Sequence, residues 1–262
     1  MAFLELKNVS KSFVSSRSRS TSLAVRDFDL EIAPGEFFCL LGPSGCGKST
    51  VLTMLAGFEH PTGGEIRVNG QPVEGPSKDR CVVFQGDDSL YPWLTAAHNV
   101  EFGLRMAGMP SAERRQKVEA ALGLVGLSGQ GSKFPAELSG GMRQRIQIAR
   151  ALVIQPKVLL MDEPFGALDA QTRHVMQHEL RKIWLATKST VVFITHDIDE
   201  AILLGTRVGV MTAGPGGTLR DVVTINIEGE RDRLDPAYTR YYAEVHGMIR
   251  DEVAKSVRAM AA

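Results

Sequence analysis

Residues 42–50 read Gly-Pro-Ser-Gly-Cys-Gly-Lys-Ser-Thr and match the phosphate-binding pattern G-x-x-x-x-G-K-S/T at every fixed position. The glycines allow a tight turn with its N–H groups directed inward. The loop and the helix after it therefore present positive potential to a di- or triphosphate. In such a loop Lys48 reaches the β- and γ-phosphates, and Ser49 binds magnesium. The candidate nucleotide-binding residues are Gly42, Pro43, Ser44, Gly45, Cys46, Gly47, Lys48, Ser49 and Thr50.

The residues on either side of this loop supply the structural context that the pattern requires. The apolar run 37–41 predicts a buried strand, and residues 51–56 predict the opening of a helix. The alternative is a glycine-rich turn with a chance Lys-Ser pair. That alternative does not account for the order of strand, loop and helix.

A second group of small residues, Ser139-Gly140-Gly141, lies directly before a helix predicted over residues 143–152. A serine hydroxyl, glycine N–H groups and the helix dipole together make an anion site. The same pattern is also that of an ordinary helix cap. On these residues alone, a cap and a second anion site both stay open.

An acidic pair follows a second apolar strand. Residues 158–161 predict a buried strand, and Asp162 and Glu163 come directly after it. We expect Asp162 to hold magnesium beside the phosphate loop, through water, and Glu163 to polarise the attacking water. A solvated strand end is the alternative. It leaves unexplained why the pair lies between apolar residues and the run Pro-Phe-Gly-Ala-Leu-Asp at 164–169.

The elements that carry these residues predict an α/β chain. Residues 81–84 and 191–195 are further apolar strands, which end at Gln85 and His196. Strands of this kind separated by helical segments favour a parallel sheet covered on both faces, with functional residues at the carboxyl ends of the strands. Residues 96–127 have helical spacing, with Ser111 as a predicted N-cap, and we interpret them as a helical insertion.

The remaining segments predict a smaller sheet and a terminal helix. Alternating residues at 3–9, 23–32 and 65–68 predict an antiparallel sheet, with a polar loop at 15–22. Asn69-Gly70 is a tight hairpin signal. A further strand is predicted at 222–227, and an amphipathic helix at 237–257.

Composition limits the function classes. Lys and Arg number 30, as do Asp and Glu, so bulk charge gives no sign of a nucleic-acid or anionic-membrane footprint. No apolar run approaches the roughly 18 residues of a membrane span, and the first residues lack the pattern of a signal peptide, so we expect a cytosolic chain. Three cysteines without metal or disulfide spacing suit a reducing compartment. Cys46, in the phosphate loop, is either a small residue that fits there or a thiol that nucleotide would shield.

Six motifs in order resemble those of ABC transporter ATP-binding subunits, and the resemblance covers nearly the whole chain. They are residues 42–50, Gln85, residues 138–142, Asp162-Glu163, residues 167–169 and His196. These are similar to the Walker A, Q-loop, signature, Walker B, D-loop and switch-histidine motifs of that family. The resemblance implies a head-to-tail homodimer in which each ATP lies between the Walker A of one copy and the signature of the other.

The resemblance also implies a role for each matching residue. Glu163 is the expected catalytic base, His196 contacts the γ-phosphate, and Gln85 senses metal and water. Ser49, Gln85 and Asp162 are the expected magnesium ligands. Ser139, Gly140 and Gly141 close on the ATP of the partner copy. Phe13 falls where the family stacks an aromatic on adenine, although ordinary sheet packing explains a Phe there equally well.

The implied fold is an α/β P-loop NTPase with a RecA-like parallel sheet, an antiparallel β subdomain and a helical signature subdomain. Residues 1–86 and 154–227 would form the nucleotide-binding core with its β subdomain. Residues 87–153 would form the helical subdomain, and residues 228–262 a C-terminal helical extension.

Three features are similar to the nitrate, sulfonate and taurine branch of importers: Pro-Trp-Leu-Thr at 92–95, residues 75–80, and Met142 where the family consensus has Gln. The resemblance implies uptake of a small anion through separate membrane subunits that dock near residues 85–94. Trp93 and Tyr91 would contribute to that docking surface or belong to the core. An extracytoplasmic solute-binding protein would act indirectly, and the dimer would lie on the cytoplasmic face of the inner membrane.

Other functions remain as alternatives. An ABC-type ATPase that acts on nucleic acid or ribosomes would need a long coiled coil or two cassettes in one chain, and the sequence has neither. We therefore expect no nucleic-acid partner. An importer for a different solute is the other alternative, because an ATP-binding subunit need not contact the solute.

Overall fold

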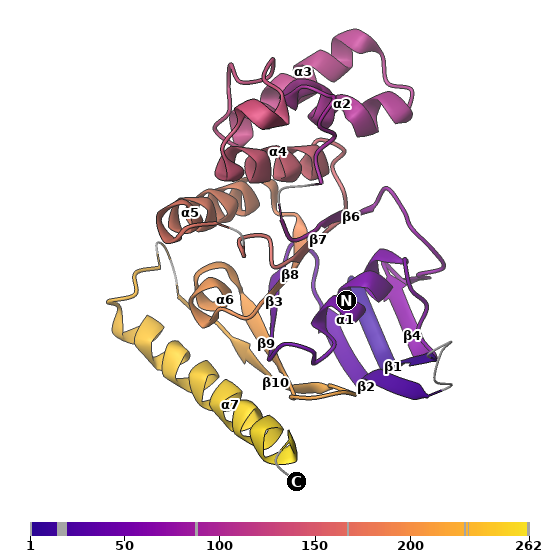
Figure 1. Cartoon of the computed structure of the whole chain (residues 1–262), viewed down its shortest axis with the longest axis vertical. Helices are drawn as coiled ribbons and strands as arrows, with labels where there is room; N and C mark the ends of the chain where they lie inside the picture. The colour runs from indigo at the N-terminus through magenta and orange to yellow at the C-terminus, as the bar shows by residue number, and fades with distance from the viewer. Residues whose placement is uncertain are drawn as a thin grey trace. The chain divides into compact units, whose positions relative to one another are not determined.

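In the computed structural model, the described residues are 2–14, 20–86, 89–166, 168–227, 229 and 231–260, with side chains described up to residue 255 (Figure 1). The chain divides into two compact units. The first comprises Met1–Ser77 and Thr190–Ala262, and the second comprises Lys78–Ser189. Parts of the predicted polar loop (15–19), of the predicted docking segment (87–88) and of the D-loop (167) lie outside the described residues.

An antiparallel sheet forms one part of the first unit. Its strands are β1 (Leu4–Val14), β2 (Thr21–Ile32), β4 (Gly63–Val68) and β5 (Gln71–Pro72), in the order β2-β1-β4-β5. Asn69 and Gly70 join β4 to β5 with φ of 51° and 74°, as a tight hairpin turn requires. The predicted antiparallel sheet is confirmed.

Parallel strands form the other part of the first unit. Strand β3 (Phe37–Leu41) pairs in parallel with β8 (Thr190–Thr195) and with β9 (Arg207–Met211). Every residue of β3 is buried, which fits a strand covered on both faces. Strand β10 (Leu219–Thr224) runs antiparallel to β9. The helices of the described part of this unit are α1 (Lys48–Ala56), α6 (Ile198–Leu204) and α7 (Pro236–Met260). Helix α7 packs on α6 and β9.

The strand predicted at 222–227 is displaced. Pairing of β10 with β9 begins at Leu219 and ends at Thr224. Val223, Ile225 and Ile227 are nevertheless buried in alternation. The alternating pattern therefore reports burial that continues past the last residue of β10, where the Ile225 N–H still donates to the Thr206 carbonyl oxygen at 2.8 Å.

The second unit combines two parallel strands with helices. Strands β6 (Arg80–Val83) and β7 (Val158–Asp162) pair in parallel. Its helices are α2 (Ala96–Met106), α3 (Ser111–Leu124), the short 3-10 helix η1 (Pro135–Glu137), α4 (Gly140–Leu152) and α5 (Ala170–Thr187). The predicted helical segment 87–153 falls within this unit, which also contains β6, β7 and α5. The predicted domain boundaries remain a prediction.

The start of α3 differs from the sequence-based expectation. Ser111 was predicted as the N-cap, but it is the first helical residue and Pro110 occupies the cap with φ −59° and ψ 144°. Proline has no N–H to leave unpaired, so it suits the extended backbone at a helix entrance.

The backbone of residues 91–95 is hydrogen-bonded to one amide side chain, that of Asn99. Asn99 is fully buried, and its amide oxygen accepts the Tyr91 N–H at 2.8 Å. Its amide nitrogen donates to the carbonyl oxygens of Tyr91, Leu94 and Thr95 at 3.0–3.1 Å. A single buried side chain thus forms hydrogen bonds with four backbone groups of this segment.

Candidate nucleotide-binding site

The phosphate loop connects β3 to α1 and closes around its lysine. Lys48 is the first residue of α1 and is 6% exposed. Its ammonium group donates to the carbonyl oxygens of Gly42 at 2.7 Å and Pro43 at 3.0 Å. The predicted strand, loop and helix are confirmed, and the loop encloses the positive charge that would meet a phosphate.

Two features of the helix start favour an anion. Gly47 is the N-cap of α1, so no side chain of that residue accepts a first-turn N–H, and the first turn carries no acidic residue. Gly47 has φ of 100°, and a Cβ there would lie 2.5 Å from the Ala24 carbonyl oxygen on β2. Only glycine fits this position, and the first-turn N–H groups face the loop without a competing carboxylate.

His196 leaves the strand next to the phosphate loop. Strands β3 and β8 are parallel, with Leu41 opposite Thr195, so Gly42 and His196 follow at the same edge. Adjacent strands lie about 4.8 Å apart. The Thr195 hydroxyl donates to buried Glu200 at 2.6 Å and accepts the Asp197 N–H at 3.0 Å. Hydrogen bonds therefore hold the residues on both sides of the exposed His196, namely Thr195 and Asp197.

Gln85, Asp162 and Glu163 follow the paired strands of the second unit. Val83 lies opposite Met161, so Gln85 and the acidic pair emerge at one edge. A Cβ on Gly166 would lie 2.9 Å from the Gln85 amide nitrogen and 3.4 Å from the Glu163 carbonyl oxygen. Glu163 has φ of 42°, and its carbonyl accepts the Gly166 N–H at 3.1 Å. This conformation is uncommon for a residue other than glycine, although the structure also has it at Asn8, Asp27, Asn69, Gln155 and Lys188.

Two side chains of α4 hold the segment after Gln85, and neither was identified from the sequence. Gln147 donates its amide N–H to the Gly86 carbonyl oxygen at 2.8 Å. Arg150 donates to the Ser89 carbonyl oxygen at 2.8 Å and to the Ser89 hydroxyl at 3.2 Å. The sequence offers no distinctive signal for either residue, because Arg143 and Gln144, one helical turn earlier on the same face, are polar as well.

The signature residues begin α4. Ser139 is its N-cap, and the Ser139 hydroxyl accepts the Met142 N–H at 3.3 Å. Gly141 is buried, and a Cβ there would lie 2.6 Å from the Thr172 methyl group on α5. Ser139 therefore does act as a cap, and Gly141 also has a packing reason to be glycine. Gly140 is half-buried between them.

A cavity of 380 Å³ opens where the N-termini of α4 and α5 meet. Asp169 caps α5 by accepting the N–H groups of Gln171 and Thr172, and these hydrogen bonds lower the pKa of its carboxyl group. The cavity is lined by Ser139, Gly141, Met142, Arg145, Gln171, Thr172 and Val175. The start of α4 and Arg145 suit a negatively charged group, whereas the first-turn N–H groups of α5 are already bonded to the Asp169 carboxylate.

Phe13 lies on β1 and is 41% exposed. The Lys11 ammonium group lies 5.0 Å from the centre of its ring. Lys11 in turn donates to Glu59 at 2.6 Å and to the His60 carbonyl oxygen at 2.8 Å. The ring is thus partly accessible and contacts a cation on its own strand, and its predicted role in adenine stacking remains a prediction.

Cys46 is fully buried in the phosphate loop. Its sulfur lies 4.0 Å from the Met211 sulfur on β9. Burial raises the pKa of the Cys46 thiol, against the opposing effect of the Lys48 charge. Of the two interpretations of this cysteine, the structure favours the small residue that fits its place.

Comparisons with known proteins identify the class. Residues 25–166, more than half of the chain, match the family described as ABC transporter. The chain belongs to the ABC transporter family and is an ATP-binding protein with ATPase activity. The predicted family, the P-loop α/β fold class and the enzymatic class are confirmed.

Individual relatives cover most of the chain. It is 45% identical over 248 residues to the nitrate import ATP-binding protein NrtD of Synechococcus elongatus, across 92% of this chain and 89% of that protein. It is 45% identical over 243 residues to the bicarbonate transport ATP-binding protein CmpD of Synechocystis sp., across 90% and 85%. The dimeric structure of the ATP-binding cassette MJ0796 bound to ADP and Pi aligns with a TM-score of 0.73 at 32% identity, across 86% and 99%.

The burial of the thiols predicts their order of reaction. With iodoacetamide at pH 7.5, we expect Cys81 to be labelled first, because it is only half-buried, although burial raises its pKa to about 11. Cys46 should react at least about tenfold more slowly, because its thiol is fully buried and the reagent cannot reach it in the folded loop. Both rates should rise with pH towards the raised pKa values, by about tenfold per unit. Peptide mass spectrometry over time measures each site, and labelling of Cys46 ahead of Cys81 would contradict the buried position.

Proposed function

We propose that this chain is the ATP-hydrolysing subunit of an importer for a small anion of the nitrate type, and that it works as a head-to-tail homodimer. The observation that carries the proposal is the presence of two anion-binding helix starts in one chain, at Lys48 and at Ser139. One nucleotide can be held from both sides only if two copies each contribute one of them. The dimeric cassette with ADP and Pi supports this arrangement, and the nitrate and bicarbonate relatives support the solute class.

In this proposal, the loop backbone and Lys48 hold the phosphates, and His196 contacts the γ-phosphate. Ser139, Gly140 and Gly141 complete the site of the partner copy. The position of His196 beside the strand that leads into the loop supports its role. The cavity at the start of α4 supports the role of Ser139.

The oxygen donors of Ser49, Asp162 and Gln85 suit magnesium, which takes oxygen ligands. Ser49 is exposed in the first turn of α1, and Asp162 is half-buried at the end of β7. When bound, the ion neutralises charge on the phosphates. Glu163 accepts the proton of the water that attacks the γ-phosphate, and Gln85 orients that water beside it. Contact of the Gln85 amide with Gly166, close to the Glu163 backbone, supports this pairing.

The same proposal assigns a membrane-docking surface to residues 91–95 and α2. Trp93 is 70% exposed, and the centre of its ring lies 5.5 Å from that of Tyr91. Tyr91 also contacts Phe102 at 4.8 Å. Asn99 fixes the backbone that carries Tyr91, and the Trp93 side chain next to it is exposed. This arrangement supports docking of a partner helix rather than a role for Trp93 in the hydrophobic core.

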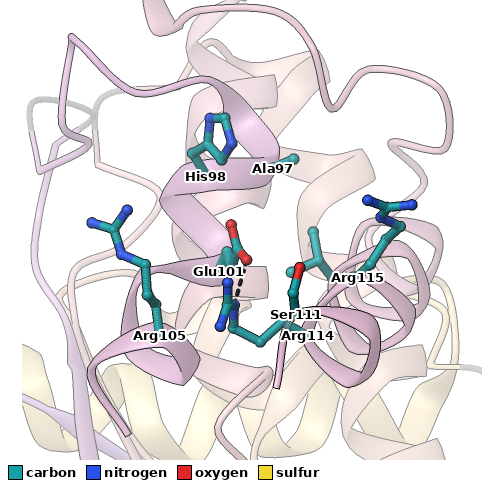
Figure 2. A pocket seen from close by; sticks show the side chains of 8 residues that line it. Ala97, His98, Glu101, Arg105, Ser111, Arg114 and Arg115 are labelled. Carbon is teal, nitrogen blue, oxygen red and sulfur yellow. Dashed lines mark hydrogen bonds and ion pairs between the residues drawn. The ribbon is translucent and has the colours of Figure 1, made fainter. Parts of the chain in front are cut away.

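A basic pocket of 390 Å³ lies between α2 and α3. Figure 2 shows the side chains that line it, with the ion pair between Glu101 and Arg114. Glu101 pairs with Arg114 at 2.5 Å, so Arg105 and Arg115 add positive charge that Glu101 does not balance. Arg105 lies 5.8 Å from the Phe102 ring, which in turn contacts Tyr91. The pocket is lined by Ala97, His98, Glu101, Arg105, Ser111, Arg114, Arg115 and Val118. It suits a carboxylate on the docking segment of a membrane subunit.

In the proposed assembly, the dimer lies peripherally on the cytoplasmic face of the inner membrane. Separate permease subunits cross the membrane, and an extracytoplasmic protein delivers the solute. Among the described residues, no helix is both long and apolar enough to cross a membrane. Gln147 and Arg150 on α4 form hydrogen bonds with the segment after Gln85. A movement at the nucleotide site could therefore reach the docking surface through these hydrogen bonds.

The first test separates binding from chemistry. Glu163→Gln should bind ATP normally, form a stable dimer with ATP, and release phosphate at least about 100-fold more slowly, because water loses its base. The double variant Glu163→Gln, Ser139→Arg should no longer form the dimer, while each monomer still binds ATP. Light scattering and phosphate release measure the two properties. The matched control is Glu179→Gln on α5, which is ion-paired with Lys182 and should behave as wild type. A wild-type rate for Glu163→Gln would remove it from the role of base.

The second test concerns docking. Trp93→Ala and Arg105→Glu should each reduce co-purification with the permease subunits by about tenfold, since each removes a central anchor, while ATPase activity of the isolated chain stays unchanged. As a control, Leu185→Ala shortens an apolar side chain on α5 that is 46% exposed, and it should have no effect on co-purification. Retention of the complex by both docking variants would refute the assignment of this surface.

The third test identifies the solute class. In vesicles that contain the complete transporter and its solute-binding protein, nitrate, a sulfonate or bicarbonate should stimulate ATP hydrolysis several-fold and accumulate inside. A neutral sugar or amino acid of similar size should do neither. Stimulation by a neutral solute alone would favour an importer for a different solute. ATPase activity stimulated by nucleic acid or ribosomes, and not by permease, would favour the alternative outside transport.

A further inference from the structure

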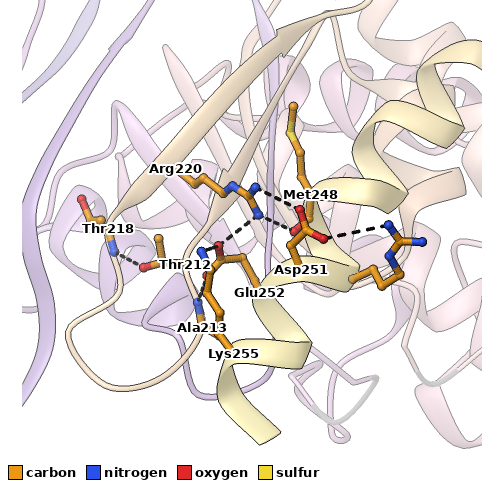
Figure 3. A network of polar contacts seen from close by, with 9 residues as sticks. Thr212, Ala213, Thr218, Arg220, Met248, Asp251, Glu252 and Lys255 are labelled. Carbon is orange, nitrogen blue, oxygen red and sulfur yellow. Dashed lines mark hydrogen bonds and ion pairs between the residues drawn. The ribbon is translucent and has the colours of Figure 1, made fainter. Parts of the chain in front are cut away.

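The carboxylate of Glu252 on α7 is buried beneath the turn between β9 and β10 (Figure 3). The Glu252 side chain is 2% exposed, and one carboxylate oxygen accepts the Ala213 N–H at 3.0 Å. The other oxygen contacts Arg220 at 3.0 Å and Lys255 at 2.6 Å. Arg220 also donates to the Met248 carbonyl oxygen at 2.7 Å. The C-terminal helix is therefore bonded to the turn at a backbone N–H and to β10 through Arg220.

Glu252 is ionised at neutral pH in this setting. Burial acts to raise the pKa of its carboxyl group, but hydrogen bonds from Lys255 and the Ala213 N–H, with the charges of Lys255 and Arg220, outweigh it. The pKa of Glu252 consequently lies below its ordinary value. A buried carboxylate with this set of donors is a fixed anchor for the groups around it.

The turn held by Glu252 comprises residues 212–218 and closes on itself. The Thr212 N–H donates to the Thr218 carbonyl oxygen, and the Thr218 N–H donates to the Thr212 hydroxyl, both at 3.0 Å. Between them the chain reads Ala-Gly-Pro-Gly-Gly. Glycine-rich backbone has little rigidity of its own, so the shape of this turn depends on the two closing hydrogen bonds and on contacts from outside. Besides Glu252, these contacts come from β2, where the Arg26 N–H donates to the Gly217 carbonyl oxygen at 3.2 Å and the Asp27 carbonyl oxygen accepts the Thr218 hydroxyl at 3.1 Å.

One side of this turn lies directly against the phosphate loop. A Cβ on Gly217 would lie 2.1 Å from the Cys46 carbonyl oxygen. A Cβ on Gly42 would lie 3.1 Å from the Met211 Cβ, and the sulfur atoms of Met211 and Cys46 are 4.0 Å apart. Met211, directly before the turn, and Gly217, near its end, thus lie against both the first residue of the loop and its middle.

We propose that Glu252 is a positioning residue for the phosphate loop. The carboxylate holds Ala213, the closed turn transmits that restraint to Met211 and Gly217, and these two residues fix Gly42 and Cys46. Phosphate binding depends on N–H groups of the loop that already point towards the phosphate. Weaker contacts of Met211 and Gly217 with the loop therefore lower nucleotide affinity. The helix that carries Glu252 lies outside residues 25–166, which match the family. The inference goes beyond the proposed function and needs only ATP binding by this chain.

The full-length chain provides the first readout. Glu252→Ala should raise the Kd for ATP about tenfold, with kcat at saturating ATP changed less than about twofold. Glu252→Gln keeps an oxygen that can accept the Ala213 N–H, so its Kd should be intermediate. Asp251→Asn is the matched control, because exposed Asp251 shares Arg220 at 3.3 Å but has no bond to the turn. Its Kd should equal that of wild type. Equal Kd values for all four proteins would overturn the proposal.

Thiol labelling provides a local readout in a Cys81→Ser background. Loss of Glu252 should accelerate labelling of Cys46, which lies against the turn, and should leave Cys39 in the centre of β3 protected. Equal acceleration at Cys46 and Cys39 would indicate general destabilisation and would refute a positioning role. Binding of ATP by the unaltered chain is measured alongside, so a failure of ATP binding itself is distinguished from a failure of this inference.

Discussion

Enclosure of the Lys48 ammonium group by the carbonyl oxygens of its own loop is the interaction on which the nucleotide site depends. The loop can take this shape only because Gly47 adopts a left-handed backbone against the Ala24 carbonyl oxygen. Strand β2 therefore limits the loop from one side. The buried strand β3 delivers the chain to the loop, and α1 begins at the lysine itself. Charge, backbone direction and helix start are thus set together.

Two further supports surround this loop in the first unit. Parallel pairing of β3 with β8 brings His196 to the same edge, and the hydroxyl of Thr195 anchors the backbone there. On another side, Met211 and Gly217 contact the loop and are restrained through the turn that Glu252 holds. Elements far apart in the chain therefore meet at one backbone segment. Such preorganisation removes the cost of ordering the loop when phosphate arrives.

The second unit links its own functional segments in a comparable way. Ser139 caps helix α4, and two to three turns later the same helix binds the segment after Gln85 through Gln147 and Arg150. Arg150 also lies 5.7 Å from the Tyr91 ring, beside the exposed Trp93. The proposed signature therefore begins α4, and the proposed sensor and docking segments both contact this helix. A displacement of α4 would move all of them together, as coupling of hydrolysis to transport requires.

The sequence alone determined the elements whose chemistry depends on local pattern. The phosphate loop, the strands that end at Gln85, Asp162 and His196, and the hairpin at Asn69-Gly70 follow from spacing and residue type, because these act over a few neighbouring residues. Tertiary structure decided what depends on distant partners: the burial of Cys46 against Met211, the packing of Gly141 on Thr172, and the anchoring by Asn99, Gln147 and Glu252. Single polar residues on helices have no distinctive local pattern. Their roles arise only when folding places a particular backbone group within hydrogen-bonding distance.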